Sequence, residues 1–297
     1  MKGILPLWKP KGMTSHDCVM KIRKLLHIKK VGHTGTLDPE VEGVLPICIG
    51  QATKIVPYLT NTKKTYIAEV KLGIATETED GHGELIESVN VTVPPSQQTI
   101  ENVLQLFRGN ITQIPPMYSA VKVKGKKLYE YARANEQVDR PKRQVSIFNL
   151  ELLKESIRPD SFRVRVVCSK GTYIRTLCVD IGDRLGYPAH MGELYRTASG
   201  GIEKEDTVTF QQVKEAVEHD NMNLLLLPVA RGLGHMQRVY VDSTVKKRVH
   251  YGQKLAKPTD APETDPFLIM AGEEVLAIYQ THPNDSSVMK PVRVFND

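Results

Sequence analysis

The sequence lacks the features of several protein classes. Its 297 residues contain only four cysteines, at positions 18, 48, 168 and 178, with no C-x-x-C pair and no histidines at the spacing of a zinc site. We therefore expect no metal site and interpret the cysteines as small buried apolar residues of a reducing compartment. No apolar run reaches the roughly 18 residues of a membrane span, and Pro6 interrupts the short apolar N-terminus. The sequence predicts a cytoplasmic protein without a signal peptide.

Nucleotide-binding motifs are also missing. There is no G-x-G-x-x-G and no Walker A sequence, and the fragment Gly232-Leu233-Gly234 lacks the third glycine. No repeat of the length found in solenoid proteins is apparent. We therefore do not expect a nucleotide-binding enzyme.

The charge balance is basic. Lysine and arginine number 40 against 34 acidic residues, which gives a net charge of +6. Such a surplus suits a polyanionic partner such as nucleic acid, and it equally suits a mildly basic protein with no such partner. The length suggests two domains, and a boundary is expected between Leu227-Pro228 and Gly234, giving domains 1–230 and 235–297.

Periodicity predicts several elements of the larger domain. Strands are expected at 4–8, 64–73, 145–153 and 161–168, and in 64–73 and 161–168 apolar residues alternate along the chain. In the last of these the alternation predicts one apolar face and one basic face, which carries Arg163 and Arg165. Helices are expected from Ser15 as the N-cap, after Ser96, and from Gly171 to a stop at Gly186. The stretch 31–43 is read as irregular and glycine-rich.

The C-terminal part is predicted to be a small, mostly β module. Short strand candidates lie at 238–241, 267–270, 275–279 and 292–295. A basic helix is expected to end at Gly252.

A basic segment interleaved with tyrosines spans residues 113–143. We interpret it as a surface arm or loop that contacts RNA, although charge runs are usually solvated linkers. The tyrosines are Tyr118, Tyr129 and Tyr131, and the cations are Lys122, Lys124, Lys126, Lys127, Arg133, Arg140, Lys142 and Arg143.

The segment with the strongest chemical signal is Gly32-His33-Thr34-Gly35-Thr36-Leu37-Asp38-Pro39. Its glycines allow a partner to approach the backbone closely, and Pro39 keeps Asp38 out of helical geometry. An aspartate in such a turn is ordinarily only a local hydrogen-bonding residue. The residues alone therefore leave its role open.

This segment, followed by Gly43-Val44-Leu45-Pro46-Ile47, resembles the signature of the TruB family of pseudouridine synthases. Four further segments agree in order and spacing with family motifs, and the resemblance covers roughly residues 3–200. They are Lys64-Thr65-Tyr66, Pro115–Ala120 with Lys122, Ser169–Thr176, and Ala189-His190 with Glu193–Thr197. Val41 departs from the smaller residue that many members carry.

The resemblance implies an α+β fold. It consists of a mixed, largely antiparallel sheet flanked by helices, an RNA-clasping insertion at about 122–143, and a small C-terminal module resembling a PUA domain. The implied activity is the isomerisation of one uridine in the T-loop of tRNA, at conventional position 55, to pseudouridine. No cofactor, metal or obligatory protein partner is implied, and we expect a monomer.

The resemblance also implies residue roles. Asp38 is the catalytic nucleophile beside C1′ of the ribose, where a carboxylate can trap or stabilise the cationic centre. Arg175 is its counter-ion and Tyr66 lies over the flipped uracil. Tyr173, Leu194 and Lys64 line the substrate pocket, His33 fills the space that the base leaves, and Arg196 joins the RNA-contact candidates.

Two rival functions remain. The chain could be an RNA-binding module without catalysis, or a synthase subunit that depends on a guide RNA. The long basic insertion favours the stand-alone enzyme.

Overall fold

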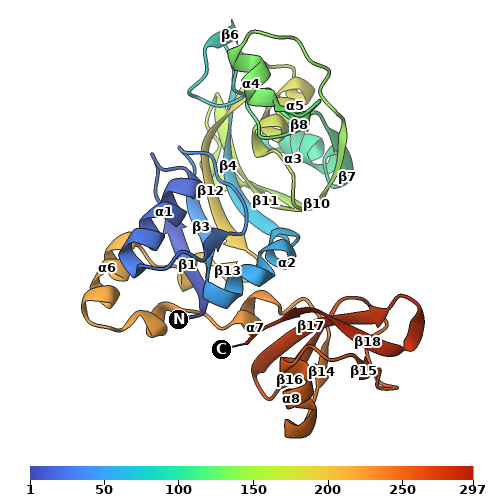
Figure 1. The fold of residues 1–297 in the computed structure, drawn as a ribbon. Coiled ribbons are helices and arrows are strands. Elements are labelled where there is room, and N and C mark those ends of the chain that lie inside the picture. The colour runs from blue at the N-terminus through green and yellow to red at the C-terminus, as the bar shows by residue number, and fades with distance from the viewer. Residues whose placement is uncertain (297) are drawn as a thin grey trace. The chain divides into compact units, whose positions relative to one another are not determined.

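The chain folds into two compact units that alternate along the sequence. The computed structural model describes residues 1–296, shown as a ribbon in Figure 1. The first unit contains Met1–Glu40, Val44–Thr60 and the residues from Gly200 onward. The second contains Val41–Gly43 and Asn61–Ser199. Each unit is described by itself below.

The second unit is built on a mixed sheet. Its strands follow the order β12-β4-β11-β10-β7, and each of these neighbours is antiparallel to the next. Along β12, Tyr195 and Arg196 pair in parallel with Glu42 and Gly43 at the start of β3. The predicted mixed, largely antiparallel sheet is confirmed. The bounds are β12 Ala189–Ser199, β4 Lys64–Leu72, β11 Ser161–Cys168, β10 Arg143–Leu153 and β7 Gly109–Gln113.

Two helices cover the apolar face of this sheet. Helices α3 (Gln97–Leu106) and α5 (Ile174–Leu185) pack against the strands and against each other (Figure 1). The predicted spacing of Ile174, Leu177 and Ile181 is confirmed, because all three are buried. Gly186, with φ 83°, ends α5 as a left-handed cap, as predicted. A separate hairpin joins β5 (Ile74–Thr76) to β6 (Leu85–Ser88).

The opposite face of β11 carries Arg163 and Arg165, as predicted, but both are paired with acidic residues. Arg163 pairs with Glu193 at 2.8 Å and Arg165 pairs with Glu151 at 3.7 Å. Glu151 lies on the neighbouring strand β10 and Glu193 lies on β12, beyond β4, so the sequence of β11 alone does not reveal them. The face carries charges of both signs.

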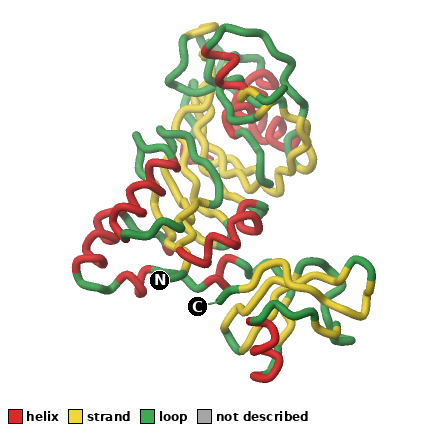
Figure 2. Tube along the Cα trace, in the orientation of Figure 1, coloured by secondary structure: helices red, strands yellow, loops and turns green. Residues whose placement is uncertain are grey.

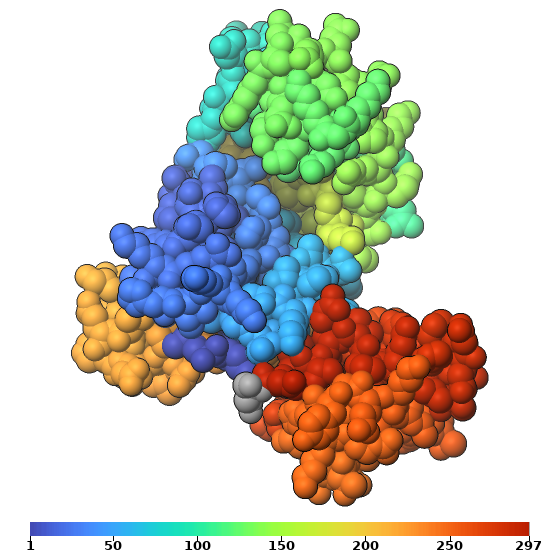
Figure 3. All heavy atoms as spheres, viewed as in Figure 1, coloured from blue at the N-terminus to red at the C-terminus, as the bar shows by residue number. Residues whose placement is uncertain are grey.

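The predicted basic loop contains regular structure. Residues Lys122–Val123 (β8) and Lys126–Lys127 (β9) form a hairpin, and Leu128–Arg133 form helix α4. The Tyr131 hydroxyl donates to the Val123 carbonyl at 3.0 Å and ties the helix to the hairpin. In the space-filling view these residues form part of the green surface (Figure 3).

The first unit begins with β1 (Gly3–Lys9), which pairs with β3 (Glu42–Ile49), while β2 (Val31–His33) runs antiparallel to β3. The stretch 31–43 is therefore less irregular than predicted. Helix α1 spans Ser15–Leu26, and its N-cap is Thr14 rather than the predicted Ser15. Two further helices are α2 (Val56–Thr60) and α6 (Phe210–Glu218).

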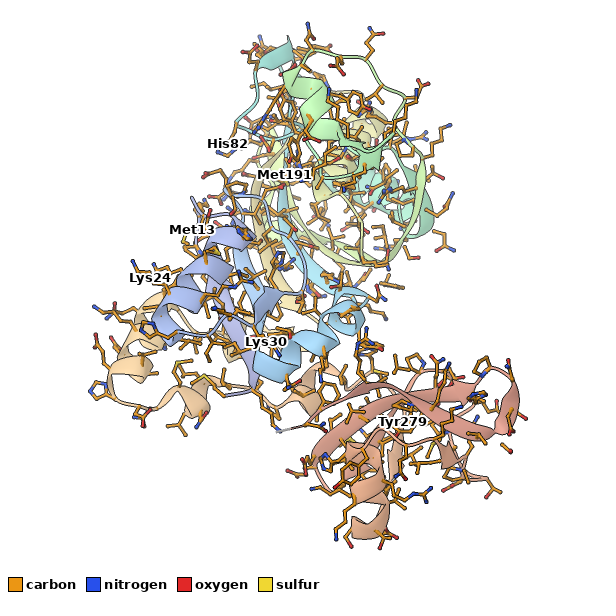
Figure 4. The ribbon with its side chains drawn as sticks, viewed as in Figure 1. Met13, Lys24, Lys30, His82, Met191 and Tyr279 are labelled. Atoms are coloured by element: carbon orange, nitrogen blue, oxygen red, sulfur yellow. The ribbon has the colours of Figure 1, made fainter. Side chains whose placement is uncertain are left out.

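The C-terminal residues form a mostly β region, as predicted (Figure 2). Its strand order is β14-β16-β17-β18-β15. Tyr279 of β17, labelled in Figure 4, is buried, and its hydroxyl donates to the Gln253 carbonyl at 2.8 Å. Met236 and Met270 share one apolar core with Ile4 and Ile55. The bounds are β14 Arg238–Tyr240, β15 Leu255–Ala256, β16 Phe267–Ala271, β17 Glu274–His282, β18 Asp285–Val294, α7 Val229–Gly232 and α8 Ser243–His250.

All four cysteines are free and buried, as predicted. Burial raises the pKa of Cys48 to about 12 and that of Cys168 to about 11. These thiols stay protonated at neutral pH and act as apolar packing groups. Among the described helices, none has the length and apolar character to traverse a bilayer.

Candidate active site

The loop that carries Asp38 is held on both sides of that residue. Before it, the Ser15 hydroxyl accepts from the Leu37 amide at 2.9 Å and donates to the Leu37 carbonyl at 3.3 Å. After it, the Pro39 carbonyl accepts from the Lys9 ammonium at 2.9 Å and from the Gly12 amide at 3.0 Å. Ser15 opens α1 and Lys9 ends β1, so two regular elements fix the backbone around a half-buried Asp38.

His33 lies at the end of β2, five residues before Asp38 in the sequence. Its Nδ1 accepts from the Gly35 amide at 3.4 Å, so a neutral ring carries its proton on Nε2. The next residue, Thr34, is fully buried, and its amide donates to the Pro46 carbonyl at 3.2 Å. These bonds hold the glycine-rich turn against β3.

In the second unit, strand register brings four predicted residues to one face. Tyr66 of β4 pairs with Arg196 of β12, Ala68 pairs with Leu194, and Lys64 pairs with Ser199. Directly paired residues point to the same side of a sheet, and residues two apart on a strand do so as well. Lys64, Tyr66, Leu194 and Arg196 therefore project from the apolar face, which α5 covers.

Arg175 lies at the start of α5 and is only 6% exposed. Its guanidinium donates to the Thr78 carbonyl at 2.9 Å and to the Tyr118 carbonyl at 3.0 Å. The two carbonyls come from segments far apart in sequence, so Arg175 joins the turn after β5 to the entrance of the basic arm. A planar guanidinium can donate to two carbonyls in fixed directions, whereas the ammonium of a lysine has no such fixed arrangement of donors.

Tyr173 is the N-cap residue of α5 and is held by an amide side chain. The Tyr173 amide donates to Gln113 Oε1 at 3.0 Å, and the Tyr173 carbonyl accepts from Gln113 Nε2 at 3.1 Å. Gln113 is almost fully buried at the end of β7. This paired contact fixes the turn that positions both Tyr173 and Arg175.

Glu79 is a residue of this region that the sequence reasoning missed. Its carboxylate accepts from the Thr176 hydroxyl at 2.7 Å and lies 4.0 Å from the Arg140 guanidinium. Burial raises the pKa of Glu79, while Thr176, Arg175 and Arg140 oppose that rise. Glu79 therefore links the helix of Arg175 to the far end of the basic arm.

Lys64 and Arg196 are both buried cations. Burial, and next the nearby charge of Arg196, lower the pKa of Lys64 to about 8. Beside them, Gly43 has φ 136°, and a side chain at this position would clash with the Arg196 carbonyl oxygen. Only glycine permits this close approach of β3 to β12. The burial of Arg196 distinguishes it from the exposed cations of the arm.

The predicted RNA-contact cations of the arm differ in exposure and pairing. Lys122, Lys124, Lys142 and Arg143 are exposed. Lys126 forms a 2.7 Å ion pair with Glu136, which neutralises part of its charge. Lys127 donates to the Tyr129 hydroxyl, and Arg133 lies over the Tyr129 ring. The arm therefore offers cations next to partly exposed tyrosine rings.

The structure thus gathers Lys64, Tyr66, Tyr173, Arg175, Leu194 and Arg196 in the second unit, whereas His33 and Asp38 belong to the first. The pairing of Asp38 with Arg175 stays a prediction. Within residues 1–296 there is no group of three or more histidine, cysteine or acidic side chains that could hold a metal ion.

Known protein families match this chain over most of its length. A model described as the N-terminal domain of the TruB family pseudouridylate synthases matches residues 23–174. A second model, described as the tRNA pseudouridylate synthase B C-terminal domain, matches residues 175–233.

Similar proteins match the chain from end to end. A protein of Oceanobacillus iheyensis named tRNA pseudouridine synthase B is 58% identical over 99% of this chain and 98% of its own. Another of that name, from Geobacillus thermodenitrificans, is 52% identical over 99% of this chain and 100% of its own.

Solved structures share the fold. A chain of an H/ACA RNP bound to a substrate RNA containing 2'-deoxyuridine has a TM-score of 0.76 and 26% identity, covering 99% of this chain and 85% of its own. A chain of a Cbf5-Nop10-Gar1 complex has a TM-score of 0.75 and 29% identity, covering 99% and 84%. The chain belongs to the TruB family of pseudouridylate synthases.

Proposed function

We propose that this chain, a tRNA pseudouridine synthase by its family, isomerises one uridine in the T-loop at conventional position 55. The observation that carries the proposal is the face of the second unit on which Lys64, Tyr66, Leu194 and Arg196 converge beneath the helix of Arg175. An aromatic ring, an apolar wall and buried cations are the groups that bind a flipped base beside a phosphodiester.

Asp38 is proposed as the catalytic nucleophile. Breaking the glycosidic bond places positive character on C1′, which a carboxylate can stabilise or trap. The detached uracil must then rotate and rejoin through C5, so water has to be kept out. The bonds of Ser15 to Leu37, and of Lys9 to Pro39, support this role because they restrict where the carboxylate can lie.

Arg175 is proposed as the counter-ion of Asp38, which would keep that carboxylate ionised in a closed pocket. Its burial and its two bonds to carbonyls support a fixed position. Tyr66 stacks on the uracil, and Tyr173 and Leu194 line the pocket. Stacking of a base on an aromatic ring contributes about 1–3 kcal/mol.

RNA binding is proposed to involve extrusion of the uridine, at a cost of a few kcal/mol. His33 fills the space that the base leaves. The arm at 122–143 grips phosphates, with residues 1–230 acting as the catalytic domain and 235–297 as a PUA-like RNA-binding domain. We further propose a cytoplasmic, monomeric enzyme that needs no cofactor.

A guide-dependent subunit is the second candidate, because the two structural neighbours come from multi-component assemblies. Their identities of 26% and 29% are lower than the 58% and 52% of the relatives named tRNA pseudouridine synthase B. The full-length match to those relatives supports a stand-alone enzyme.

The test is incubation of the purified chain alone with unmodified tRNA and with an isolated T-arm stem-loop, followed by mapping of pseudouridine. We expect one modified T-loop uridine in both RNAs. Modification only after addition of a guide RNA or partner protein would favour the second candidate. Binding without modification under every condition would indicate an RNA-binding module.

A further inference from the structure

Phe148 lies in the middle of β10, yet its side chain is 50% exposed. The register explains why: Ile147 pairs with Cys168 and Asn149 with Val167, which leaves Phe148 as an extra residue at a β-bulge. Bulges redirect a side chain that strict alternation would place elsewhere. Its neighbours Ile147 and Leu150 are buried, so the sheet does not need the Phe148 ring for its core.

Two exposed lysines lie where β10, β11 and β4 meet, and one of them lies over the ring. The Lys63 ammonium lies 4.3 Å from the centroid of the Phe148 ring. The Lys170 ammonium donates to the Asn61 side-chain oxygen at 2.6 Å, so a neutral amide orients it without cancelling its charge. Among the described residues, neither Lys63 nor Lys170 forms an ion pair with a carboxylate. The ring therefore lies in a positive environment.

The patch lies next to the candidate active site within the second unit. Cys168 pairs with Ile147 on one side and with Lys64 on the other, so β10, β11 and β4 meet there. Lys63 directly precedes Lys64, and the charge of Lys170 contributes to the lowered pKa of Lys64. From Lys170 the chain leads within three residues to Tyr173.

We infer that Phe148, Lys63 and Lys170 form a second RNA contact, separate from the arm at 122–143. The Phe148 ring stacks on a nucleobase or ribose near the target uridine, and the two ammonium groups contact phosphates. A flat ring among unpaired cations matches single-stranded or looped nucleic acid, whose bases stack while its phosphates attract charge. A protein partner needs a larger apolar area than one ring. The inference rests on the proposed function.

The test compares Phe148→Ala, Phe148→Tyr, Lys63→Gln and Lys170→Gln with wild type for binding to a T-arm stem-loop. Two matched controls on the same unit change an exposed apolar residue, Leu106→Ala, and an exposed cation, Lys154→Gln. The Kd is measured at several salt concentrations, and pseudouridine formation is measured at saturating enzyme. Thermal melting verifies that each variant is folded.

We expect Phe148→Ala to raise Kd about tenfold without changing its salt dependence, while Phe148→Tyr stays within about twofold of wild type. Each lysine variant should reduce the slope of log Kd against log salt by roughly 0.7–0.9, the value of one lost phosphate contact. The controls should match wild type in both respects.

Two failures can be told apart. If wild type binds and modifies the RNA while the alanine and both glutamine variants behave as wild type, the second contact does not exist and the proposed function stands. If wild type neither binds nor modifies the RNA, the proposed function fails and this inference fails with it.

Discussion

Ser15→Ala should slow catalysis more than its effect on stability accounts for. The Ser15 hydroxyl makes two bonds to the backbone of Leu37, at 2.9 and 3.3 Å. Ser15 and Leu37 are 1% and 4% exposed, so water cannot readily replace the lost partner. An unsatisfied buried amide costs about 1–3 kcal/mol, which sets the expected loss in free energy of unfolding.

The effect on rate arises because Leu37 immediately precedes Asp38. A displacement of about 1 Å at a reacting group can cost a hundredfold in rate. Lys9 and Gly12 still hold Pro39 in the variant, so we expect an intermediate loss of about tenfold. The assay is single-turnover pseudouridine formation on a T-arm stem-loop at saturating enzyme, well below the melting temperature.

Thr14→Ala is the matched control. Thr14 is the exposed N-cap of the same helix, and its removal should cost about 1 kcal/mol of stability without touching the Leu37 loop. We expect similar melting temperatures for the two variants but a reduced rate only for Ser15→Ala. Equal single-turnover rates for both would refute the role assigned to Ser15.

Three further predictions concern the second unit. Arg175→Lys keeps the positive charge but loses the planar guanidinium that bonds to the Thr78 and Tyr118 carbonyls. We expect turnover to fall more than tenfold while the affinity for RNA stays nearly unchanged. A wild-type single-turnover rate would show that Arg175 is not part of the active site. Glu79→Ala should lower the free energy of unfolding by about 1–3 kcal/mol in urea, whereas Glu79→Gln, which can still accept from Thr176, should lose less than half as much. Burial, and next the charges of Glu79 and Asp183, raise the pKa of Asp180 to about 6. The folded state therefore keeps this proton to a higher pH than the unfolded chain does. As the pH rises from about 4 to 6, the contribution of Asp180 to the free energy of unfolding falls. Asp180→Asn should therefore raise urea stability by about 1–2 kcal/mol at pH 7 and leave it unchanged at pH 4, and an equal effect at both values would contradict this pKa shift.

The sequence predicted correctly those helices and strands whose apolar spacing and end residues all lie within one short segment. The helix of Arg175 combines an apolar spacing with a left-handed Gly186 cap, and β11 alternates strictly. In contrast, no strand was predicted at β12, although β12 pairs with both β3 and β4. Its sequence, AHMGELYRTAS, mixes charged and apolar residues without a clear period, because buried Arg196 and Leu194 occupy the same face.

The site itself depends on long-range register. Motif resemblance named Tyr66, Leu194 and Arg196, but only the pairing of β4 with β12 shows that they share a face. Glu79 was missed because the run Glu77-Thr78-Glu79-Asp80 is typical of an exposed loop. The positive φ of 62° at Glu79 and its contact with Thr176 depend on tertiary structure.

The central claim is tested most directly by Asp38→Asn, which preserves shape and removes the carboxylate. The measurement is pseudouridine formation in a single turnover with saturating variant enzyme, alongside the Kd for the same T-arm stem-loop. We predict that the variant binds the RNA with a Kd close to that of wild type and forms no pseudouridine. Formation of pseudouridine at the wild-type rate would contradict the assignment of Asp38 as the nucleophile.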